Sequence, residues 1–319
     1  MKAILYERYG PPEVLELREI PKPTPRDREV LIRVHATTVT AADWRLRSLS
    51  APKGFGILMR LALGPSKPRR PILGAELSGE IESVGRAVST FKVGDQVFAG
   101  VLATYVEYKC VREDGPLALK PANLGYEEAA ALSFGGLTAL AIVRKAKIQK
   151  GESVLINGAS GAVGTAAVQI AKHHGARVTG VCSAANLELV KSIGAERVID
   201  YTREDFARGG ETYDVVVDNV GNAPFSRVKG SLKKGGRLLL VVGTLPDMLL
   251  SPVVSLGTGK KVVVVPARAR AEDLRVLARL AESGSFKPVI DRVYPFERMV
   301  EAHRYVDTGR KRGNVVVTL

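Results

Sequence analysis

Strands and helices alternate over residues 150–283 in a pattern that few folds can accommodate. Apolar runs of strand length, such as SVLIN at 153–157 and RLLLVVG at 237–243, are separated by glycine turns and helix-like stretches. Nearly continuous apolar strands joined through helices are typical of a parallel sheet that is covered on both faces. This part of the chain therefore predicts an α/β, doubly wound domain.

The flanking parts of the chain have a different texture. Residues 1–120 contain short strand-like runs, such as EVLIRVHATTV at 29–39, that are broken by proline and glycine. This punctuation predicts an antiparallel, barrel-like β domain. The last stretch returns to short strands around one helix and completes that domain. The predicted domains are thus residues 1–122 with 285–319, and residues 123–284.

The turn NGASGAVG at 157–164 joins a predicted strand to a predicted helix that stops at Gly175. Gly161 would let backbone N–H groups approach a pyrophosphate, and Gly164 would let the helix pack closely on its strand. Ala159 replaces the first glycine of the G-x-G-x-x-G pattern, which the turn tolerates if the φ angle of Ala159 stays negative. We interpret the turn as a dinucleotide site; an ordinary glycine-rich turn is the alternative.

The end of the next strand bears on which dinucleotide binds. Enzymes that prefer NAD usually carry an acid there, which binds the ribose hydroxyls and would repel a 2′-phosphate. Here the strand ends in Cys182-Ser183, and the first acid is Glu188. Ser183 can donate to a phosphate oxygen, so the sequence favours NADPH.

Composition sets broad limits on location and partners. The chain has 319 residues, two cysteines and a formal net charge of +14. No apolar run is long enough to span a membrane and no signal peptide is recognised, so we expect a cytoplasmic protein without a membrane partner. The basic residues are scattered, with short clusters at 67–70, 268–270 and 310–312. We expect a solvated basic surface, and nucleic-acid binding stays open as an alternative.

Several motifs, in this order, carry a family resemblance: GPPEVLELREIP at 10–21, ILGAELSGEIESVG at 72–85, FKVGDQVFAG at 91–100, SFGGLTALAIV at 133–143 and LVKSIGAERVIDY at 189–201. With the turn at 157–164, they make the chain resemble the medium-chain dehydrogenase/reductase superfamily, most of all its zinc-free quinone and enone reductases. The resemblance implies a Rossmann nucleotide domain with a GroES-like catalytic domain. It also implies a homodimer, for which the strand at 260–267 is a candidate edge.

The resemblance also implies that zinc is absent. Zinc-dependent relatives place ligands at three positions that here are Thr40, Ala75 and the segment 131–133, none of which offers Cys or His. Without a metal to polarise an alcohol, hydride transfer from NADPH to a quinone or a conjugated carbonyl is the expected reaction. A reductase of another activated alkene, or one that prefers NADH, is the alternative. A structural or RNA-binding protein that keeps the nucleotide fold is the alternative from a different class.

The resemblance assigns cofactor-binding roles to residues at the ends of the predicted strands. They are Thr138 near the nicotinamide; Ser160, Gly161, Ala162, Val163 and Gly164 at the pyrophosphate; Ser183 and Tyr201 at the 2′-phosphate; and Asn219, Val242 and Gly243 on the ribose and nicotinamide side.

Candidate catalytic residues are Asp43, Arg45 and Tyr105. A surface ion pair between Asp43 and Arg45, and a plain strand aromatic at Tyr105, are the alternatives; solvent could also supply the proton. The segment 54–71 is expected to be either a helical flap over the substrate, with Phe55, Leu58 and Met59 as its apolar face, or simple core packing.

Overall fold

The structure is a computed structural model in which residues 1–265 and 269–319 are described, and it divides into two compact units. Unit 1 comprises Met1–Ala51, Gly56–Phe134 and Ala269–Leu319, and unit 2 comprises Pro52–Phe55 and Gly135–Arg268. The boundaries expected from the sequence, 122/123 and 284/285, both fall inside unit 1.

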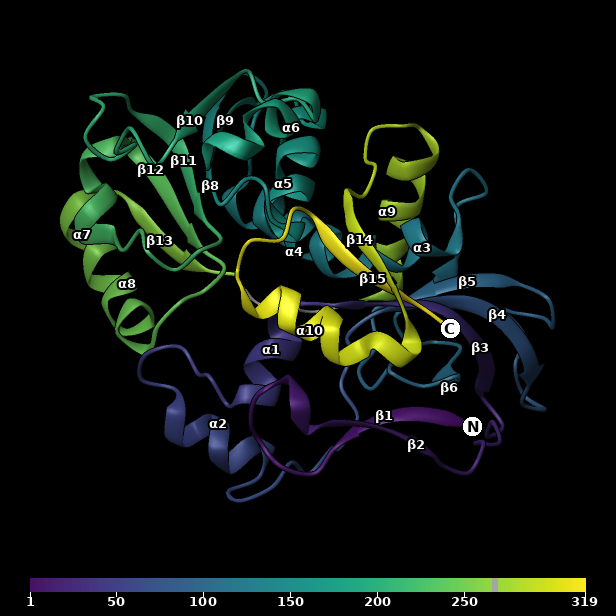
Figure 1. The fold of residues 1–319 in the computed structure, drawn as a ribbon. Helices are drawn as coiled ribbons and strands as arrows, with labels where there is room; N and C mark the ends of the chain where they lie inside the picture. Colours follow the sequence, from purple (N-terminus) through teal and green to yellow (C-terminus); the bar gives the residue numbers. More distant parts are fainter. Residues whose placement is uncertain (266–268) are drawn as a thin grey trace. The chain divides into compact units, whose positions relative to one another are not determined.

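Unit 2 is built on a six-stranded parallel sheet (Figure 1). Its strands are β8 (Ser153–Asn157), β9 (Arg177–Cys182), β10 (Arg197–Asp200), β11 (Tyr213–Asp218), β12 (Leu232–Leu240) and β13 (Lys261–Val264). They lie in the order β10-β9-β8-β11-β12-β13, so the direction of winding reverses between β8 and β11. This order is that of a Rossmann fold, and the predicted doubly wound sheet is confirmed.

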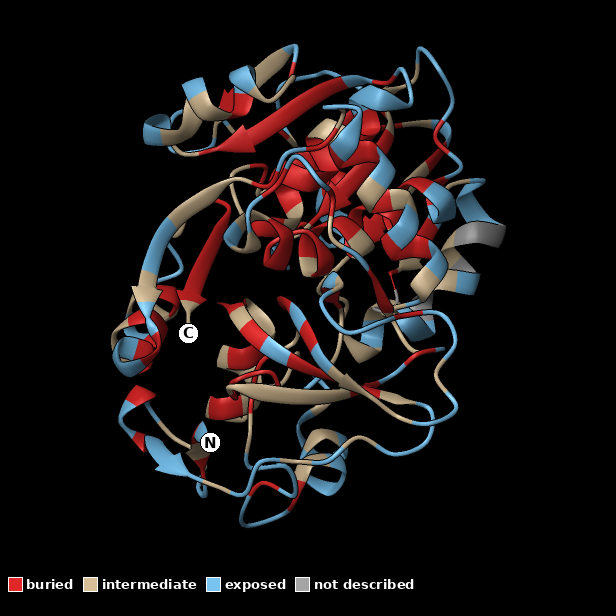
Figure 2. Ribbon diagram, turned by 90° about the vertical axis from the view of Figure 1, so that its right-hand side faces the viewer, coloured by how far each residue is buried: buried red, intermediate tan, exposed pale blue. Residues whose placement is uncertain are grey.

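Helices cover both faces of this sheet. They are α4 (Ser133–Ala146), which begins at the unit boundary, α5 (Ala162–His173), α6 (Leu187–Ser192), α7 (Phe225–Val228) and α8 (Leu245–Thr258), with short 3₁₀ turns at Ala184–Asn186 and Lys229–Ser231. Figure 1 shows α5 and α6 on one side of the sheet and α7 and α8 on the other. The core between them is apolar, with Leu155, Val216 and Leu238 fully buried (Figure 2).

Unit 1 holds a largely antiparallel seven-stranded sheet in the order β14-β15-β3-β4-β5-β7, with β6 paired to β3, and a two-stranded ribbon of β1 and β2. The strands are β1 (Lys2–Tyr6), β2 (Leu15–Glu19), β3 (Glu29–Val39), β4 (Leu77–Val84), β5 (Gln96–Ala99), β6 (Tyr108–Arg112), β7 (Leu117–Leu119), β14 (Ile290–Pro295) and β15 (Asn314–Thr318). As predicted, the C-terminal segment completes this unit, because β15 pairs with β3.

The helices of unit 1 are α1 (Ala41–Ser48), α2 (Gly56–Leu63), α3 (Tyr126–Ala130), α9 (Ala271–Glu282) and α10 (Met299–Asp307), with 3₁₀ turns at Pro12–Val14 and Phe296–Arg298. Asn123 donates its side-chain amide to the carbonyl of Ala281 at 2.9 Å, which ties the start of the α3 segment to α9. Such contacts explain why the unit extends beyond the boundaries expected from the sequence. No helix in the described parts of the chain is both long and apolar enough to cross a membrane.

The segment at 54–71 forms α2 followed by a turn. None of the residues of α2 is buried, and Ile57, Leu58 and Leu61 are 78%, 55% and 59% exposed. The core-packing alternative for this segment is therefore wrong. Its role as a flap stays a prediction.

Candidate functional site

The carboxyl ends of the unit 2 strands bring polar groups to one edge of the sheet. Asn157, the last residue of β8, is in register with Asp218 at the end of β11 and with Val181 in β9. Asp200, which ends β10, is in register with Cys182. Ligands of doubly wound sheets bind at this edge, next to the reversal in strand order.

The turn after β8 has the geometry that a pyrophosphate site needs. Gly158 takes the left-handed conformation, with φ = +76°, whereas Ala159 keeps a negative φ. Ala159 therefore fits the turn as expected. A side-chain carbon added to Gly164 would lie 2.1 Å from the carbonyl oxygen of Gly158, so only glycine packs there. A side-chain carbon added to Gly161 would have its nearest neighbour, the Gly158 oxygen, 3.7 Å away, so there is open space next to the first backbone amides of α5.

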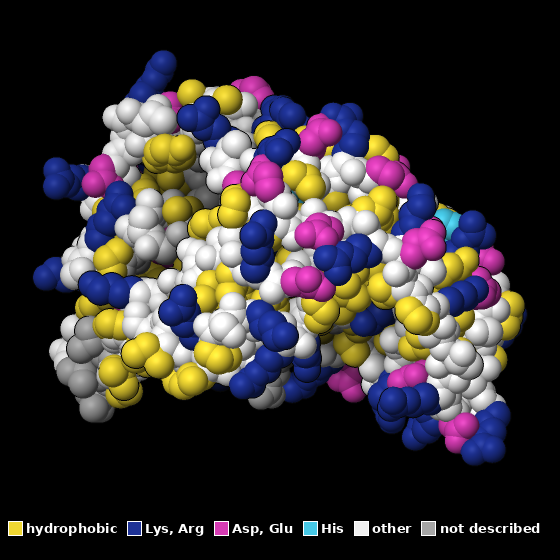
Figure 3. Space-filling model, turned by 60° about the horizontal axis from the view of Figure 1, so that its bottom comes forward, with side chains coloured by type: hydrophobic (Ala, Val, Ile, Leu, Met, Phe, Trp, Pro, Cys, Tyr) yellow, Lys and Arg dark blue, Asp and Glu magenta, His cyan; other side chains and the backbone are white. Residues whose placement is uncertain are grey.

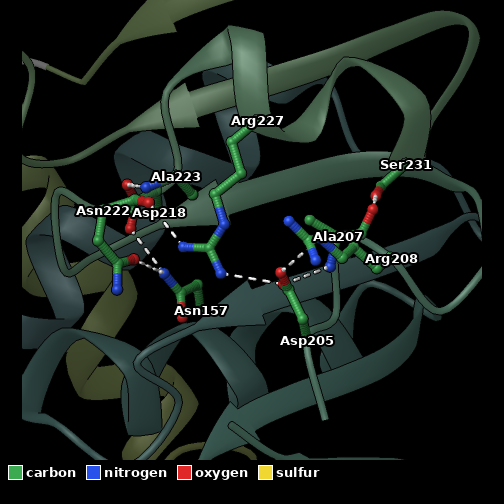
Figure 4. A network of polar contacts seen from close by, with 9 residues as sticks. All are labelled: Asn157, Asp205, Ala207, Arg208, Asp218, Asn222, Ala223, Arg227 and Ser231. Carbon is green, nitrogen blue, oxygen red and sulfur yellow. Dashed lines mark hydrogen bonds and ion pairs between the residues drawn. The ribbon is translucent and has the colours of Figure 1, made fainter.

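Asp218 organises the loop that follows β11 (Figure 4). Its carboxylate is 1% exposed and accepts hydrogen bonds from the side chain of Asn157 at 2.9 Å and from the backbone N–H groups of Val220, Gly221 and Ala223 at 3.0, 3.1 and 2.8 Å. Asn157 also donates to Asn222 at 2.7 Å. Four donors on one buried carboxylate fix the backbone of residues 219–223 beside the glycine turn.

Asn186 brings two of the expected cofactor residues together. Its amide nitrogen lies 3.3 Å from the hydroxyl of Ser160 and 3.1 Å from the hydroxyl of Ser183, so it bridges the turn after β8 and the end of β9. Its side-chain oxygen is buried and has no hydrogen-bond partner among the described residues. The three side chains form one polar cluster at the place where the sequence predicts the 2′-phosphate.

A carboxylate from the neighbouring strand lies close to this cluster, although the sequence places no acid between Ser183 and Glu188. Asp200 accepts hydrogen bonds from the backbone and side chain of Thr202 at 3.0 and 2.8 Å, which lower the pKa of its carboxyl. Burial, and then the charge of Asp200, raise the pKa of Cys182 to about 11. Cys182 is 2% exposed, in agreement with a role as a small buried side chain.

Most of the other expected cofactor residues follow strands of unit 2 at this edge, and Thr138 lies on a helix. Asn219 follows β11 and donates to the carbonyl of Asn157 at 3.1 Å, while its own side-chain oxygen is buried without a partner among the described residues. Val242 and Gly243 follow β12. Tyr201 follows β10 and is 61% exposed. Thr138 lies in α4 and is 8% exposed.

In unit 1, Asp43 is enclosed rather than presented at the surface. It is 1% exposed and forms a capping box with Thr40 at the start of α1, accepting from the Thr40 hydroxyl at 2.6 Å. Its other oxygen accepts from the backbone N–H of Gly74 at 2.8 Å. The surface ion pair with Arg45 is therefore wrong, and Asp43 has the contacts of a positioning residue instead of one that touches substrate.

Tyr105 is also enclosed, and it belongs to a buried polar chain. Its hydroxyl lies 3.1 Å from Nε2 of His303, whose Nδ1 lies 3.2 Å from the Arg47 guanidinium, which in turn donates to Asp307 at 2.5 Å. Tyr105 and His303 are 0% exposed and Arg47 is 1% exposed. A direct contact between Tyr105 and a substrate is thus not what the structure provides, and Tyr105 precedes β6 instead of lying within a strand.

The hydrogen-bond donors fix the protonation of His303 in this row of buried polar side chains. Arg47 is always charged and can only donate, so Nδ1 of His303 accepts and Nε2 carries the proton that points to Tyr105. Burial, and then the charge of Arg47, lower the pKa of His303 well below its usual value, so the imidazole is neutral. Burial, followed by the negative charge of Asp43, raises the pKa of Tyr105.

Arg45 is the one expected catalytic residue that stays partly exposed. Its guanidinium lies 5.7 Å from the ring of Trp44, and burial lowers its pKa. Of the three expected catalytic residues, it is the only one whose side chain could contact a small molecule.

Comparisons with known proteins identify the family of the chain. Residues 26–153 match the alcohol dehydrogenase GroES-like domain, and residues 193–317 match a zinc-binding dehydrogenase domain. The chain is 33% identical to a chloroplast envelope quinone oxidoreductase homolog of Arabidopsis thaliana, over 99% of this chain and 98% of that protein. The chain belongs to the quinone oxidoreductase branch of the medium-chain dehydrogenase/reductase superfamily.

Two further members of the superfamily concern the cofactor. An NADPH-dependent alkenal/one oxidoreductase, chloroplastic, of Arabidopsis thaliana is 31% identical over 99% of this chain and 79% of that protein. The crystal structure of an Escherichia coli quinone oxidoreductase complexed with NADPH has a TM-score of 0.83 and 26% identity, and each chain is covered completely.

At the positions where the resemblance implies zinc ligands, the structure shows the following contacts. The Thr40 hydroxyl is engaged in the α1 capping box, and Ala131 is 1% exposed. Glu76, next to Ala75, is fully buried and accepts from Thr38 and, at 2.5 Å, from the backbone N–H of Phe134. Burial raises the pKa of Glu76 to about 7.

Five polar residues at the carboxyl-end edge of the unit 2 sheet were not predicted from the sequence. They are Asn157, Asn186, Asp200, Asp218 and Asn222. A signal for two of them was available, because Asn157 and Asp218 are polar residues that each directly follow a run of three apolar strand residues. Nothing in the sequence indicates that Asn186 bridges Ser160 and Ser183.

The residues of this edge fit a dinucleotide phosphate. Gly161 leaves open space beside the backbone amides, and the serine hydroxyls of Ser160 and Ser183 can donate to phosphate oxygens. The unpartnered oxygens of Asn186 and Asn219 can accept from ribose hydroxyls.

Proposed function

We propose that this protein is an NADPH-dependent reductase of quinones or α,β-unsaturated carbonyls that works without zinc. The observation that carries the proposal is the Ser160–Asn186–Ser183 cluster beside the glycine turn, where a 2′-phosphate would meet hydroxyl donors. The names of the related quinone and alkenal/one oxidoreductases support the substrate class. Alanine and threonine at the zinc-ligand positions support the absence of zinc.

The chain's own residues would hold the nucleotide through hydroxyl groups and backbone N–H donors. The amides at the start of α5, opened by Gly161, would bind the pyrophosphate, and Asp218 would keep residues 219–223 in place for the ribose. Ser183 and Tyr201 would bind the 2′-phosphate, and Ser160, which Asn186 joins to Ser183, would lie at the pyrophosphate. Thr138, Ala162, Val163, Val242 and Gly243 complete the proposed set.

Bound NADPH would supply a hydride, and a conjugated acceptor needs only a hydrogen-bond donor and a proton in addition. Because Asp43 and Tyr105 are enclosed, we assign them to positioning: Asp43 fixes α1 and the backbone of Gly74. Arg45 is the proposed donor to the acceptor oxygen, and solvent supplies the proton.

The cofactor part of this proposal is tested by measuring the binding of NADPH and NADH to wild type and to Ser183→Asp by nicotinamide fluorescence. A carboxylate at position 183 would repel the 2′-phosphate, so the affinity for NADPH should fall at least tenfold, which is about 1.4 kcal/mol. The affinity for NADH should stay the same or improve.

Ser192→Asp is the matched control, since it adds the same charge at an exposed position of α6. It should leave both affinities unchanged. If wild type binds NADH as tightly as NADPH, the assignment of the 2′-phosphate cluster is wrong, and Asp200 dominates the pocket.

We also propose that the protein is a cytoplasmic homodimer. β13 is an edge strand of the unit 2 sheet, and Val263 and Val264 within it are only partly covered, which favours pairing with a second copy.

Residues 266 and 267 of the expected edge lie outside the described residues, as does Arg268 of the basic cluster at 268–270. Both cysteines are unpaired, as expected in a reducing compartment. Equilibrium sedimentation tests the dimer, and a monomer would refute it.

A further inference from the structure

Unit 1 contains a pocket that none of the proposed steps uses. Its volume is about 570 Å³, and apolar side chains from several elements form most of its wall. They include Leu46 of α1, Leu63 of α2, Ile72 and Leu73 before β4, and Leu102 after β5. A pocket of this size with apolar walls suits a small molecule.

Cations gather on the rest of the wall. Arg69, Arg70 and Lys109 all line the pocket. None of the three forms an ion pair with a carboxylate among the described residues. The sequence explains why: no Asp or Glu occurs from residue 44 to residue 75, whereas this stretch carries seven Lys and Arg residues. Figure 3 shows Lys and Arg side chains interspersed with hydrophobic ones on the face that it draws.

Two of these cations lie near one another. Burial lowers the pKa of Lys109, and the charge of Arg70 contributes in the same direction. Like charges that share a partly desolvated site repel each other unless an anion joins them. The exposed Lys and Arg residues elsewhere in the chain often have an acidic partner, as Arg227 has in Asp205 at 3.0 Å (Figure 4).

A buried tyrosine adds an independent indication. Tyr6 is 3% exposed and lines the same pocket. Its hydroxyl makes no hydrogen bond to any described residue, and burial raises its pKa to about 12. Although the residue as a whole is buried, its hydroxyl is not among the buried polar atoms that lack a partner, so it is accessible from the pocket and can donate a hydrogen bond to a bound molecule.

We propose that this pocket binds a small amphipathic anion, whose apolar body packs against Leu46, Ile72 and Leu73 and whose carboxylate or sulfonate-like head is held by Arg70 and Lys109. Tyr6 donates a hydrogen bond to the same ligand. Arg69 adds positive charge at the rim. The proposal concerns unit 1 alone and stands whether or not the protein is a reductase.

The test uses two fluorescent probes of nearly the same shape and the full-length protein without nucleotide. One is the anion 8-anilinonaphthalene-1-sulfonate, and the other is its neutral counterpart N-phenyl-1-naphthylamine. The double variant Arg70→Gln/Lys109→Met should bind the anion at least tenfold more weakly and the neutral probe as well as wild type does. Unchanged binding of the anion would overturn the proposal.

Matched variants separate this effect from a general loss of charge or fold. Lys234→Met/Arg275→Gln removes two exposed cations that lie outside the pocket, and it should bind both probes as wild type does. An equal loss of affinity in this control would overturn the proposal. Binding of the neutral probe shows that the double variant is folded. If the double variant does not fold, Arg69→Gln, at an exposed position, replaces it. This variant should show a smaller loss of affinity for the anionic probe. An unchanged affinity would overturn the proposal.

Two further measurements test the location and the ligand class. Ala62→Trp places a large side chain in the pocket wall and should reduce the binding of both probes; normal binding would place the probes elsewhere and refute the site. Decanoate should displace the anionic probe, whereas inorganic phosphate at the same concentration should not. Displacement by phosphate alone would show that the site lacks the apolar half of the proposed recognition.

Discussion

The carboxylate of Asp218 should contribute more to stability than any other acid at the nucleotide edge. It is 1% exposed, and one of its oxygens accepts from Asn157, Val220 and Gly221 while the other accepts from the backbone N–H of Ala223 at 2.8 Å. In Asp218→Asn, the amide oxygen can replace the first of these oxygens. The amide nitrogen then faces the Ala223 N–H, so two donors oppose each other.

The cost of this change follows from the bonds that are lost. A hydrogen bond to a charged group is worth roughly 1.5–3 kcal/mol, and a neutral one about 1 kcal/mol. Loss of the Ala223 bond and weakening of the others therefore predict a decrease of about 2–4 kcal/mol in the free energy of unfolding. We also expect residues 219–223 to become mobile, which should weaken NADPH binding about tenfold.

The assay is urea denaturation followed by tryptophan fluorescence and circular dichroism, with NADPH titration of the folded variant. Asp205→Asn is the matched control in the same unit (Figure 4). Asp205 pairs with Arg227 at 3.0 Å but is partly exposed, so its loss should cost about 0–1 kcal/mol. Equal unfolding midpoints for Asp218→Asn and wild type, or a larger loss in Asp205→Asn, would refute the reasoning.

Three further predictions concern single side chains. Gly164→Ala places a carbon 2.1 Å from the Gly158 oxygen and should destabilise the fold by about 3 kcal/mol. Gly161→Ala leaves 3.7 Å to the nearest atom, so this variant should unfold like wild type but bind NADPH more weakly. Thermal denaturation and fluorescence titration with NADPH compare the two variants. Cys182, whose pKa is raised to about 11, should react slowly with iodoacetamide at pH 8 and faster as the pH approaches 11; rapid labelling at pH 8 would contradict its burial. Burial raises the pKa of Glu76 to about 7 in the folded state, above its unfolded value of 4.5, so between these pH values the folded protein binds a proton that the unfolded chain has released. The free energy of unfolding should therefore fall by roughly 3 kcal/mol as the pH rises from 4.5 to 7. Glu76→Gln should flatten that part of the pH profile of the unfolding midpoint, and an unchanged profile would show that Glu76 is not its source.

The parallel sheet of unit 2 could be predicted because its determinants are local. Apolar strands such as SVLIN, the stop at Gly175 and the glycine turn each carry their own signal, and their alternation with helices predicts the parallel sheet. The order of the strands within the sheet was not predicted. The tight packing at Gly164 and the negative φ of Ala159 were likewise expected from the turn pattern.

The expectations that the structure does not support depended on distant contacts. Asp43 and Arg45 are two residues apart and look like a surface pair, yet Asp43 turns inward because Gly74, 31 residues later, donates to it. Tyr105 is held by His303, which lies 198 residues away. The sequence gives no means of pairing such residues, since each is an unremarkable polar or aromatic position within its own segment.

Zinc-independent reduction by NADPH can be measured by following NADPH oxidation at 340 nm with purified protein that has been dialysed against a chelator. A quinone and an α,β-unsaturated ketone serve as acceptors, and a saturated alcohol with NADP⁺ serves as the comparison. We expect oxidation of NADPH by at least one acceptor, no effect of added zinc and no turnover of the alcohol. Alcohol oxidation that appears only when zinc is added, with no reduction of either acceptor, would contradict it.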